Sequence, residues 1–518
     1  MKRPRTTASA RDGYVIFAVL IVIVVLSLVA YRYTDAMSSE YQAAVRANDA
    51  TQARLAAISG LYYAAAVLSD RLTFYNELGG NPYDNPDIFE LFEIPVPGPN
   101  GTTRMAYFSI QCATVNDEGS SVQRYGVIDE GGKININSMI ALDPKGERLR
   151  EALMKLPNMT AAIADAIVDW VDADDEPRAE GAESSYYLSL PNPYKAKNGP
   201  LNSLDELLLV QGVTPELLYG GDRNRNGLMD EGEENASRGW SDYLTVYGRE
   251  INVDINGNPR IYLNGDNLQT LYSDLEAAVG AELATYVVAH KLFGSQPVST
   301  NTSGKVTTVA VGPEQLYQVV QERIAATGSS GRRIRSVAEL IGTQIRLPRP
   351  PGYPKDAPDP VVYSPLNTPE GLAELFPRLL DATTVRQAIE MTPRININSA
   401  PMEVLMAIPG ISDLEVAGIL AGRPNQDPTS PATTTGAWLV TSGLMDPSRF
   451  RRLERYITGT SMVYRVQAIG FLEKGGPVAR FEAILDTNQG APRFLQIRDL
   501  SDLDHPRGFQ PPIVPNRR

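Results

Sequence analysis

Residues 14–30 read YVIFAVLIVIVVLSLVA, and this apolar stretch decides how the rest of the chain is organised. Ser27 is its one clearly polar member, and a helix of about 17 such residues is long enough to cross a bilayer. The segment before it carries a basic excess, made by Lys2, Arg3, Arg5 and Arg11. Because basic residues flank membrane helices on the cytoplasmic side, we expect the N-terminus in the cytoplasm and the main body outside it.

Three interpretations of this N-terminus stay open. A secretory signal peptide needs small residues at a cleavage site after the apolar run, and SLVAYRYTDA (27–36) offers a poor one. A plain signal anchor is the second interpretation. The third is a prepilin leader at 1–13, in which a glycine marks cleavage on the cytoplasmic side and the apolar run stays in the mature protein. Gly13 followed by Tyr14 fits this third pattern.

The helical pattern continues beyond the apolar run. Neither Pro nor Gly interrupts the chain from there until Gly60. Apolar side chains recur at helical spacing, at Leu55, Ile58, Tyr62, Ala65, Leu68 and Leu72. One helix of roughly 60 residues would extend about 90 Å. Residues 31–80 are therefore expected to form a stalk whose second half packs on a sheet.

Strand patterns lie at both ends of the remaining chain. Residues 81–104 are rich in Pro, Gly and Asn and are expected as a loop that ends the stalk. The expected strands are 105–115 and 122–129 on the N-terminal side, and 461–473, 476–486 and 491–500 on the C-terminal side. The fold class is then α+β, with a long helix packed on a small antiparallel sheet and a large helical domain inserted between the strands.

The middle of the chain repeats one unit three times. Each copy opens on a strand-like segment, KININS (133–138), RIYLNG (260–265) or RININS (394–399). Two helices around a short turn follow, and a third helical signal comes later. The expected domains after the stalk are the first strands (81–131), repeat 1 with a calcium loop (132–259), repeat 2 (260–345), a Pro-rich linker (346–392), repeat 3 (393–458), the last strands (459–501) and an extended tail (502–518).

The turns of the repeats resemble helix-hairpin-helix motifs. Repeat 3 carries Ile408-Pro409-Gly410-Ile411, a tight turn whose amides could face a phosphate. A membrane-anchored protein that binds or takes up DNA through these repeats is the alternative function. The net charge of −13 speaks against it, because nucleic-acid binders cluster Lys and Arg. Acidic residues flank the turns instead, namely Asp165, Asp169, Asp274, Glu282, Asp413 and Glu415.

The segment DRNRNGLMDEGE (222–233) meets every position of a twelve-residue calcium loop. Gly227 permits the sharp bend, and the expected calcium ligands are Asp222, Asn224, Asn226, the Leu228 carbonyl, Asp230 and Glu233. No long helices flank it, so we expect a structural calcium clip in place of disulfides, which a chain with Cys112 alone cannot form.

A second acidic cluster lies at 172–183. It contains Asp172, Asp174, Asp175, Glu176 and Glu183, which could hold another calcium ion or form a solvated loop. Paired carboxylates can also serve hydrolysis, but no base or nucleophile accompanies them, and the two histidines, His290 and His505, lie far apart. The sequence therefore predicts no enzyme.

Four segments together resemble the K-type minor pseudopilins of type II secretion systems, the general secretion pathway protein K family. They are Gly13-Tyr14, GKININ (132–137), the run 168–218 and ININSAPMEVLMAIPGI (395–411). The resemblance implies a pilin fold, a structural place at the pseudopilus tip in protein export, and anchoring in the bacterial inner membrane with the main body in the periplasm. It also implies bound calcium.

The resemblance further implies processing and partners. A prepilin peptidase would cut after Gly13 and Tyr14 would be N-methylated. The I-type and J-type minor pseudopilins, the inner-membrane secretion platform and the lipid bilayer would be partners, with no nucleic acid. Most pilins carry Glu at the fifth mature position and K-type members lack it; here that position is Ala18. The middle repeat is an added copy relative to the family.

Overall fold

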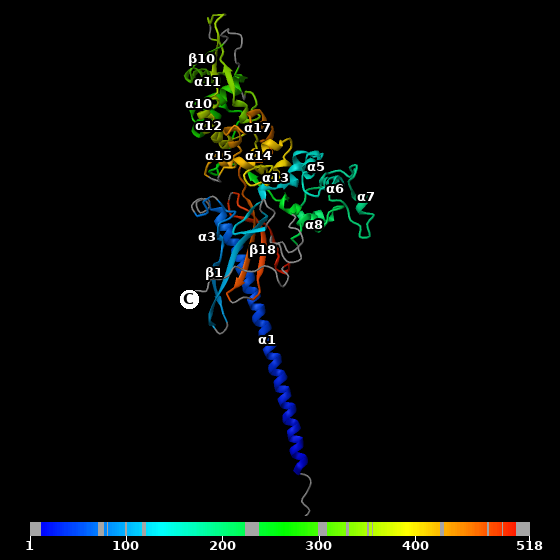
Figure 1. Ribbon diagram of the computed structural model, residues 1–518. Coiled ribbons are helices and arrows are strands. Elements are labelled where there is room, and N and C mark those ends of the chain that lie inside the picture. The colour runs from blue at the N-terminus through cyan, green and yellow to red at the C-terminus, as the bar shows by residue number, and fades with distance from the viewer. Residues whose placement is uncertain are drawn as a thin grey trace, which may run out of the picture.

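The protein has a long helix, a sheet packed on its upper part and a large helical head above the sheet (Figure 1). The computed structural model describes residues 12–70, 77–79, 81–98, 101–115, 121–222, 238–298, 308–327, 331–349, 352–354, 356–424, 429–473, 476–488 and 490–503. The mixed fold with a long N-terminal helix is confirmed. The tail beyond residue 503 and most of the leader lie outside the described residues.

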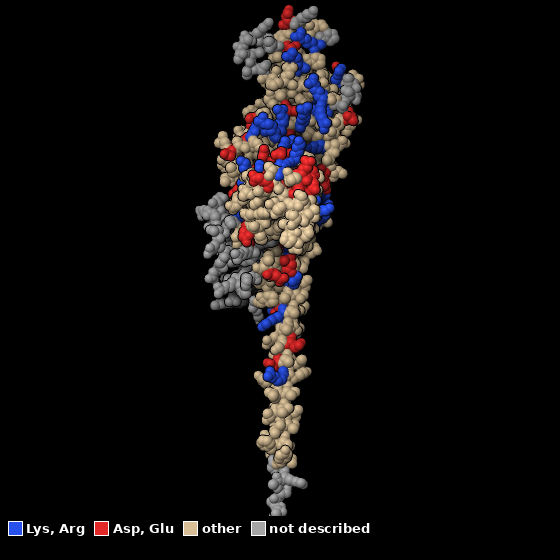
Figure 2. All heavy atoms as spheres, turned by 90° about the vertical axis from the view of Figure 1, so that its right-hand side faces the viewer, with Lys and Arg blue, Asp and Glu red and all other residues tan. Residues whose placement is uncertain are grey.

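Helix α1 spans Asp12–Ser69 and has two different halves. From Tyr14 to Val29 its large apolar side chains are at least half exposed, and it is the one described helix long and apolar enough to cross a membrane. Figure 2 shows that this lower part of the stalk carries no charged side chain. From Ala53 onward the helix is amphipathic, and small residues such as Ala57 and Ala64 let it lie close to the sheet.

The sheet is antiparallel and draws strands from both ends of the chain. Its strands are β1 (Phe92–Pro97), β2 (Thr103–Val115), β17 (Val463–Leu472), β18 (Ala479–Asp486) and β19 (Arg493–Asp499), paired in the order β1-β2-β17-β18-β19. Two short strands join it, β3 (Ser121–Arg124) on β2 and β4 (Ile128–Asp129) on β17. In the central pair Ile110 lies opposite Ala468 and Phe108 opposite Gly470, facing α1.

Strand β1 corrects the expectation of a loop at 81–104. FEIPVP pairs with β2 over its whole length, with Ile94 opposite Ala106. The two prolines make the segment look like a loop in the sequence, because proline lacks the N–H that a central strand needs. An edge strand leaves alternate N–H groups unpaired, so Pro95 and Pro97 are tolerated there. A short helix, α3 (Pro86–Phe89), precedes it.

The helical head leaves the sheet at β4 and is tied there by buried charges. Glu130, in the 3-10 turn η2 (Glu130–Gly132), accepts hydrogen bonds from Arg465 Nε at 2.8 Å and Lys133 Nζ at 2.9 Å. Arg465 also donates to Glu482 at 2.9 Å. Burial alone would raise the pKa of Glu130, but the two cations hold it at about 2. The network fixes the root of the head to β17 and β18.

Each repeat of the head begins and ends with paired strands. Repeat 1 runs through β5 (Ile134–Asn135), α4 (Ile136–Leu142), α5 (Glu147–Leu153), α6 (Ala161–Val171), α7 (Ser184–Tyr187), η3 (Leu204–Leu209), α8 (Pro215–Tyr219), η4 (Trp240–Asp242) and β6 (Leu244–Thr245). Repeat 2 runs through β8 (Ile261–Tyr262), α9 (Leu268–Val279), α10 (Ala281–Phe293), β9 (Gln296–Pro297), β10 (Thr308–Ala310), α11 (Pro313–Thr327), η5 (Val337–Leu340), β11 (Thr343–Arg346), β12 (Asp359–Tyr363), η6 (Pro365–Asn367), α12 (Pro369–Ala382) and β13 (Thr383–Thr384).

Repeat 3 lies between the other two and above the sheet (Figure 1). It runs through β15 (Ile395–Asn396), α13 (Met402–Met406), α14 (Asp413–Gly422), α15 (Pro431–Thr434), α16 (Trp438–Thr441), α17 (Pro447–Leu453) and β16 (Ile457–Thr458), and the pair β7 (Glu250–Ile251) and β14 (Glu390–Met391) lies between repeats. The opening strand of every repeat pairs in parallel with its closing strand, β5 with β6, β8 with β13 and β15 with β16.

An asparagine after the opening strand holds two of the repeats together in the same way. In repeat 1, Asn137 accepts from the backbone N–H of Leu201 at 2.8 Å and donates to its carbonyl at 2.9 Å. In repeat 2, Asn264 makes the same two bonds to Ile334, at 2.8 and 2.9 Å. The asparagine therefore closes the loop between the helix pair and the third helical element.

The closing strand of repeat 2 corrects the boundary placed at residue 345. The segment 346–392 was expected as a Pro-rich linker, yet it contains β12, α12 and β13, and Val361 and Phe376 are buried. Pro369 stands at the start of α12, where its missing N–H has no partner to lose. The prolines of residues 346–360 favour a linker, but the segment that follows them has the amphipathic pattern of a helix.

Gly470 provides a test of the contact between α1 and the sheet. A Cβ on this β17 residue would lie 2.1 Å from the Ala53 carbonyl oxygen and 2.4 Å from the Ala57 nitrogen, both backbone atoms of α1. Gly470→Ala should lower the free energy of unfolding by about 1–3 kcal/mol, because the stalk must shift off the sheet. Thermal unfolding of the full chain in non-ionic detergent measures this.

Gly312→Ala is the matched control, since a Cβ there meets open space. An equal effect of the two substitutions would contradict the close packing of α1 on β17.

Candidate metal centre

The second acidic cluster is assembled by the end of helix α6. Thr160 caps the start of α6 by accepting from the Ile163 N–H at 3.3 Å, and the helix is buried from Ile163 to Val171. Asp172 is its C-terminal cap. A turn then brings the chain back to Glu183, which caps α7. The buried helix thus fixes one carboxylate, and the returning turn supplies the others.

Three of the predicted ligands come together. Asp172, Asp174 and Glu183 each offer a carboxylate oxygen within 4.8 Å of the other two. The side chains of Asp172 and Glu183 are buried, at 7% and 1% exposure, whereas Asp174 is exposed. A cation there would have access from solvent through Asp174.

The other two predicted residues do not join this group. Asp175 accepts hydrogen bonds from the Ser184 N–H at 3.3 Å and the Asn198 side chain at 3.5 Å, so it holds the turn in place. Glu176 takes part through its backbone, whose N–H donates to Asp174 at 3.0 Å, while its residue is exposed. The five acidic residues are irregularly spaced, so the sequence does not indicate which of them come together.

Asn198 is a residue of this centre that the sequence did not reveal. Its backbone has a φ of 47°, a left-handed conformation that Asn tolerates, and its N–H donates to the Trp170 carbonyl at 3.0 Å. Its amide donates to the Asp174 carbonyl, and its Oδ1 is buried without a hydrogen-bond partner. The Asn-Gly pair at 198–199 marks a turn in the sequence, but not the place to which that turn returns.

Several buried oxygens of the centre lack a hydrogen-bond donor. They are Asp169 Oδ1, Asp172 Oδ1, both carboxylate oxygens of Glu183, and Asn198 Oδ1. Buried polar atoms are almost always satisfied in folded proteins. Hard oxygen ligands of this kind, mixing carboxylates with an amide oxygen, suit a calcium ion. The residues therefore fit a calcium ion better than they fit a hydrogen-bonded acidic loop.

The electrostatics of the centre agree with an unmet positive charge. Burial, and then the charges of Asp169, Asp172 and Asp175, raise the pKa of Glu183 to about 8. Burial and the neighbouring Asp174 raise the pKa of Asp172 to about 6. Arg178, whose Nε lies 3.6 Å from Asp169 Oδ1, acts in the opposite direction on the pKa of Asp172 but does not cancel the rise. A divalent cation would allow these carboxyls to stay ionised at neutral pH.

The other calcium loop lies almost wholly outside the described residues. Asp222 is the last described residue before it, and Asn224, Asn226, Leu228, Asp230 and Glu233 fall in the undescribed part. On either side of the loop, Gly220 pairs with Arg238 in an antiparallel bridge. The described residues on the two sides of the loop, Gly220 and Arg238, therefore lie side by side.

The turns that a DNA-binding interpretation would use are partly covered by the protein itself. Asn158, Gly280 and Gly410 have positive φ at equivalent places in the three repeats, so the turns are alike. Trp240 donates to the Pro157 carbonyl at 2.9 Å, and Arg449 donates to the Gly410 carbonyl while pairing with Glu415. These contacts stabilise the turns as packing elements, and the helix-hairpin-helix motif itself stays a prediction.

Comparisons with known proteins point to one family. Residues 132–219, which include the whole centre, match the first domain of the family described as Type II secretion system (T2SS), protein K. A protein named type II secretion system protein K from Pectobacterium carotovorum is 42% identical over 55 residues, 11% of this chain and 17% of that protein. Its namesake from Pseudomonas aeruginosa is 29% identical over 103 residues, 18% of this chain and 31% of that protein.

The chain thus spans less than a third of the length of these two relatives in the regions that align. Among solved structures, the crystal structure of the GspK-GspI-GspJ complex from the enterotoxigenic Escherichia coli type 2 secretion system is similar with a TM-score of 0.36 and 13% identity, over 90% of this chain and 99% of that chain. Residues 132–219 of the chain are thus similar to the first domain of the type II secretion system protein K family.

Proposed function

We propose that this chain is a structural minor pseudopilin that caps the tip of a type II secretion pseudopilus and takes part in protein export. The match of residues 132–219 to the secretion protein K family is the observation that carries the proposal. Before assembly the chain is held in the bacterial inner membrane by residues 14–30, with the leader 1–13 in the cytoplasm and the head in the periplasm. A prepilin peptidase removes the leader after Gly13, and Tyr14 becomes the methylated N-terminus.

The exposed apolar half of α1 supports the anchoring. Its large apolar side chains from Tyr14 to Val29 are at least half exposed, and each CH₂ that becomes buried is worth about 0.8 kcal/mol. Such a surface needs either lipid or other apolar helices around it. A pseudopilin uses both in turn, first the bilayer and then the core of the filament, which it enters through the membrane-bound secretion platform.

The shape of the molecule supports a terminal position. The head sits at the end of the sheet opposite the free end of the stalk, where a further subunit would have to stack (Figure 1). Ala18 at the fifth mature position removes the carboxylate that would pair with the terminal amine of a subunit ahead. A subunit with nothing ahead of it needs no such partner.

The flank of the stalk offers a surface for the I-type and J-type minor pseudopilins. Leu55 and Tyr62 on α1 are 58% and 62% exposed, and Ile497 on the edge strand β19 is 50% exposed. Tyr62 contacts Phe494 of β19 edge to face, with ring centroids 5.2 Å apart. We assign these exposed apolar residues to packing against the helices of neighbouring subunits.

Calcium completes the first repeat in this proposal. One ion binds Asp172, Asp174, Glu183 and Asn198, and a second is held by the loop 222–233. The orphaned oxygens of the first centre and the paired ends of the second loop are what support the two sites. Both ions stabilise loops that no disulfide can hold, since Cys112 has no partner cysteine.

The terminal position predicts the effect of a charge at Ala18. Ala18→Glu should weaken assembly of the minor pseudopilins, because a carboxylate without a partner costs about 2.5–3.5 kcal/mol at the centre of a membrane helix. Ala18→Val should leave assembly unchanged. Co-purification with the I-type and J-type subunits, and secretion in a strain lacking the parent chain, measure both. Full assembly of the Ala18→Glu variant, with labelling along filament shafts, would contradict a tip subunit.

The two calcium sites predict a stoichiometry. Titration calorimetry of the full chain should find two ions in the parent, one after Asp172→Asn with Glu183→Gln, and one after Asp222→Ala with Glu233→Ala. Saturation at a hundredfold excess over Kd should stabilise each occupied site by about 2.7 kcal/mol. Glu176→Gln, in the same loop but outside the group, should keep both ions. Binding of two ions by either double variant would sink that site.

Acid–base linkage predicts a further difference between the metal-free and calcium-loaded chains. The pKa of Glu183 in the metal-free fold lies near 8, above its ordinary 4.5, so the stability it gives is full below pH 4.5 and is lost as the pH rises through 8. In chelator the melting temperature should therefore fall between pH 5 and pH 8. Calcium, or Glu183→Gln, should flatten this fall, whereas Glu176→Gln should not. An unchanged fall in both would exclude Glu183 as its source.

A further inference from the structure

A cavity of about 270 Å³ lies between repeats 2 and 3 and is lined by arginines. They come from the start of β8, the segment before η5, the segments around β13 and β15, and the end of α17; they are Arg260, Arg335, Arg386, Arg394, Arg451 and Arg455. Figure 2 shows that Lys and Arg side chains gather on the upper part of the head, although the whole chain has a net charge of −13. The match to the secretion family ends at residue 219, so it does not include this cavity.

The arginines form a half-buried floor and an exposed rim. Arg260, Arg394 and Arg455 are half-buried, and the other three are exposed. Hydroxyl groups stand among them, on Thr383, Thr384, Thr434, Thr435 and Thr458. Four of these hydroxyls, on Thr383, Thr384, Thr434 and Thr435, already donate to backbone carbonyls, so the guanidinium N–H groups are the main donors that the lining offers to a ligand. The lining is therefore rich in donors and positive charge.

Carboxylates neutralise only part of this charge. Arg394 pairs with Glu250, with Nε donating at 3.1 Å to both of its oxygens, and Arg260 lies 3.8 Å from Asp381. Glu339, beside the cavity, accepts from the Arg335 backbone N–H at 3.2 Å and lies 3.5 Å from His290.

The three rim arginines form no ion pair with a described carboxylate. Within the residues that the structure describes, no carboxylate oxygen lies within 4.0 Å of a guanidinium nitrogen of Arg335, Arg386 or Arg451. Arg455 donates to the Tyr456 hydroxyl at 2.8 Å, yet its Nε is buried and has no acceptor. A buried donor without an acceptor points to a missing anionic or polar partner.

Glu454 is the single carboxylate among the residues that line the cavity. It accepts from the Ser336 hydroxyl at 2.8 Å and faces Arg394 and Arg386. Burial raises the pKa of Glu454 to about 7, although the Ser336 hydrogen bond and the nearby arginines act in the opposite direction. Its raised pKa makes Glu454 a weaker counter-charge near neutral pH than an ordinary glutamate.

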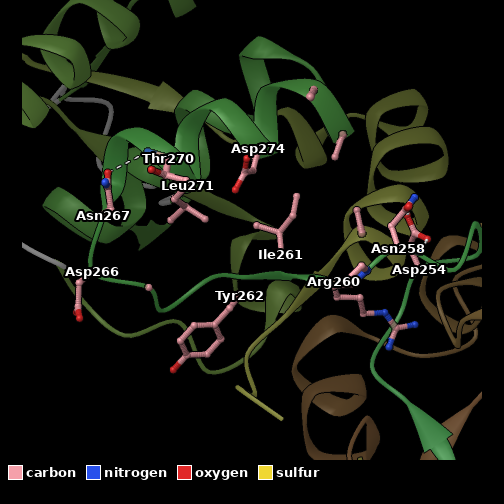
Figure 3. A pocket seen from close by; sticks show the side chains of 15 residues that line it. Asp254, Asn258, Arg260, Ile261, Tyr262, Asp266, Asn267, Thr270, Leu271 and Asp274 are labelled. Atoms are coloured by element: carbon pink, nitrogen blue, oxygen red, sulfur yellow. Dashed lines mark hydrogen bonds between the residues drawn. The ribbon is translucent and has the colours of Figure 1, made fainter. Parts of the chain in front are cut away.

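A second cavity lies next to the arginine cavity and differs from it in charge. It measures about 650 Å³, shares Arg260 with the first and is lined by Asp254, Asp266 and Asp274. Figure 3 shows these carboxylates spread around an open space, with Arg260 at its edge. Two adjacent cavities in one head thus have opposite charge.

We propose that the arginine cavity binds a compact dianionic oxyanion of the phosphate class, either free phosphate or a small phosphomonoester. Guanidinium forks match the oxygens of such a group two at a time. A cavity of 270 Å³ lies below the usual range for drug-sized ligands, about 300–1,000 Å³, so it takes a small group. A nucleic acid needs a row of cations along its backbone, whereas these arginines line a single small cavity.

The ligand would lie between two consecutive repeats and contact both of them. Arg335 and Arg386 belong to repeat 2 and its exit, and Arg451 and Arg455 belong to repeat 3. An anion between them neutralises charges that otherwise repel. Binding should therefore stabilise the packing of repeat 2 against repeat 3.

Titration calorimetry of the full chain in non-ionic detergent, at constant ionic strength and pH 8, tests the proposal with inorganic phosphate as the probe. Arg386→Gln with Arg451→Gln should weaken binding at least tenfold. Arg378→Gln, an exposed α12 residue that pairs with Glu374 outside the cavity, should leave it within twofold. Glycerol 3-phosphate and a short-chain phosphatidate below its micelle concentration distinguish the sources, since the true one binds tighter than inorganic phosphate.

Glu454→Gln separates a binding site from a merely structural cluster. It keeps an acceptor for Ser336 and removes the negative charge, so phosphate should bind several-fold more tightly, an effect that misfolding cannot produce. No phosphate binding below about 10 mM, or unchanged affinity in both the arginine and the Glu454 variants, would overturn the proposal. Displacement of phosphate by duplex DNA, with a steep salt dependence, would also overturn it in favour of a nucleic-acid site.

Discussion

The antiparallel pairing of β2 with β17 is the constraint on which the rest of the structure depends. Everything between Val115 and Val463 must leave and return at neighbouring positions of one sheet, and that sheet must also cover α1. The buried charges at Glu130 and Arg465 lie where the head departs. Removing one partner of such a network leaves the remaining charges buried and unpaired, which costs about 3–5 kcal/mol. Stalk, sheet and head are therefore one mechanical unit.

Much of this framework could be predicted from the sequence, because it rests on simple periodicities. The uninterrupted helical pattern gave α1, and the apolar runs at 105–115 and 461–473 correspond to β2 and β17. The errors have one cause, which is the weight given to proline. Pro95 and Pro97 concealed an edge strand, and the prolines before residue 361 concealed β12 and α12. Composition cannot tell whether an N–H is needed, since that depends on the neighbouring strand.

The candidate centre was predictable only in its local part. Asp172, Asp174 and Glu183 are close in sequence, so a single turn brings them together. Asn198 comes from a later segment that returns to Trp170, a contact decided by the tertiary fold. The arginine cavity is a stronger case, because its members are drawn from positions between 260 and 455 and no local pattern connects them. A site built from residues close in sequence can be predicted from the sequence, whereas a site built from distant residues becomes visible only in the folded structure.

The paired opening and closing strands of each repeat have an evolutionary consequence. In repeat 2, Ile261 lies beside Thr383 and Tyr262 beside Thr384, so the chain enters and exits at the same place. A coding segment for such a unit can be duplicated or spliced out while the flanking backbone keeps its course. Proteins built on this plan could lengthen their heads in whole steps, with each newly acquired module free to diversify its outer surface while the older ones stay unchanged.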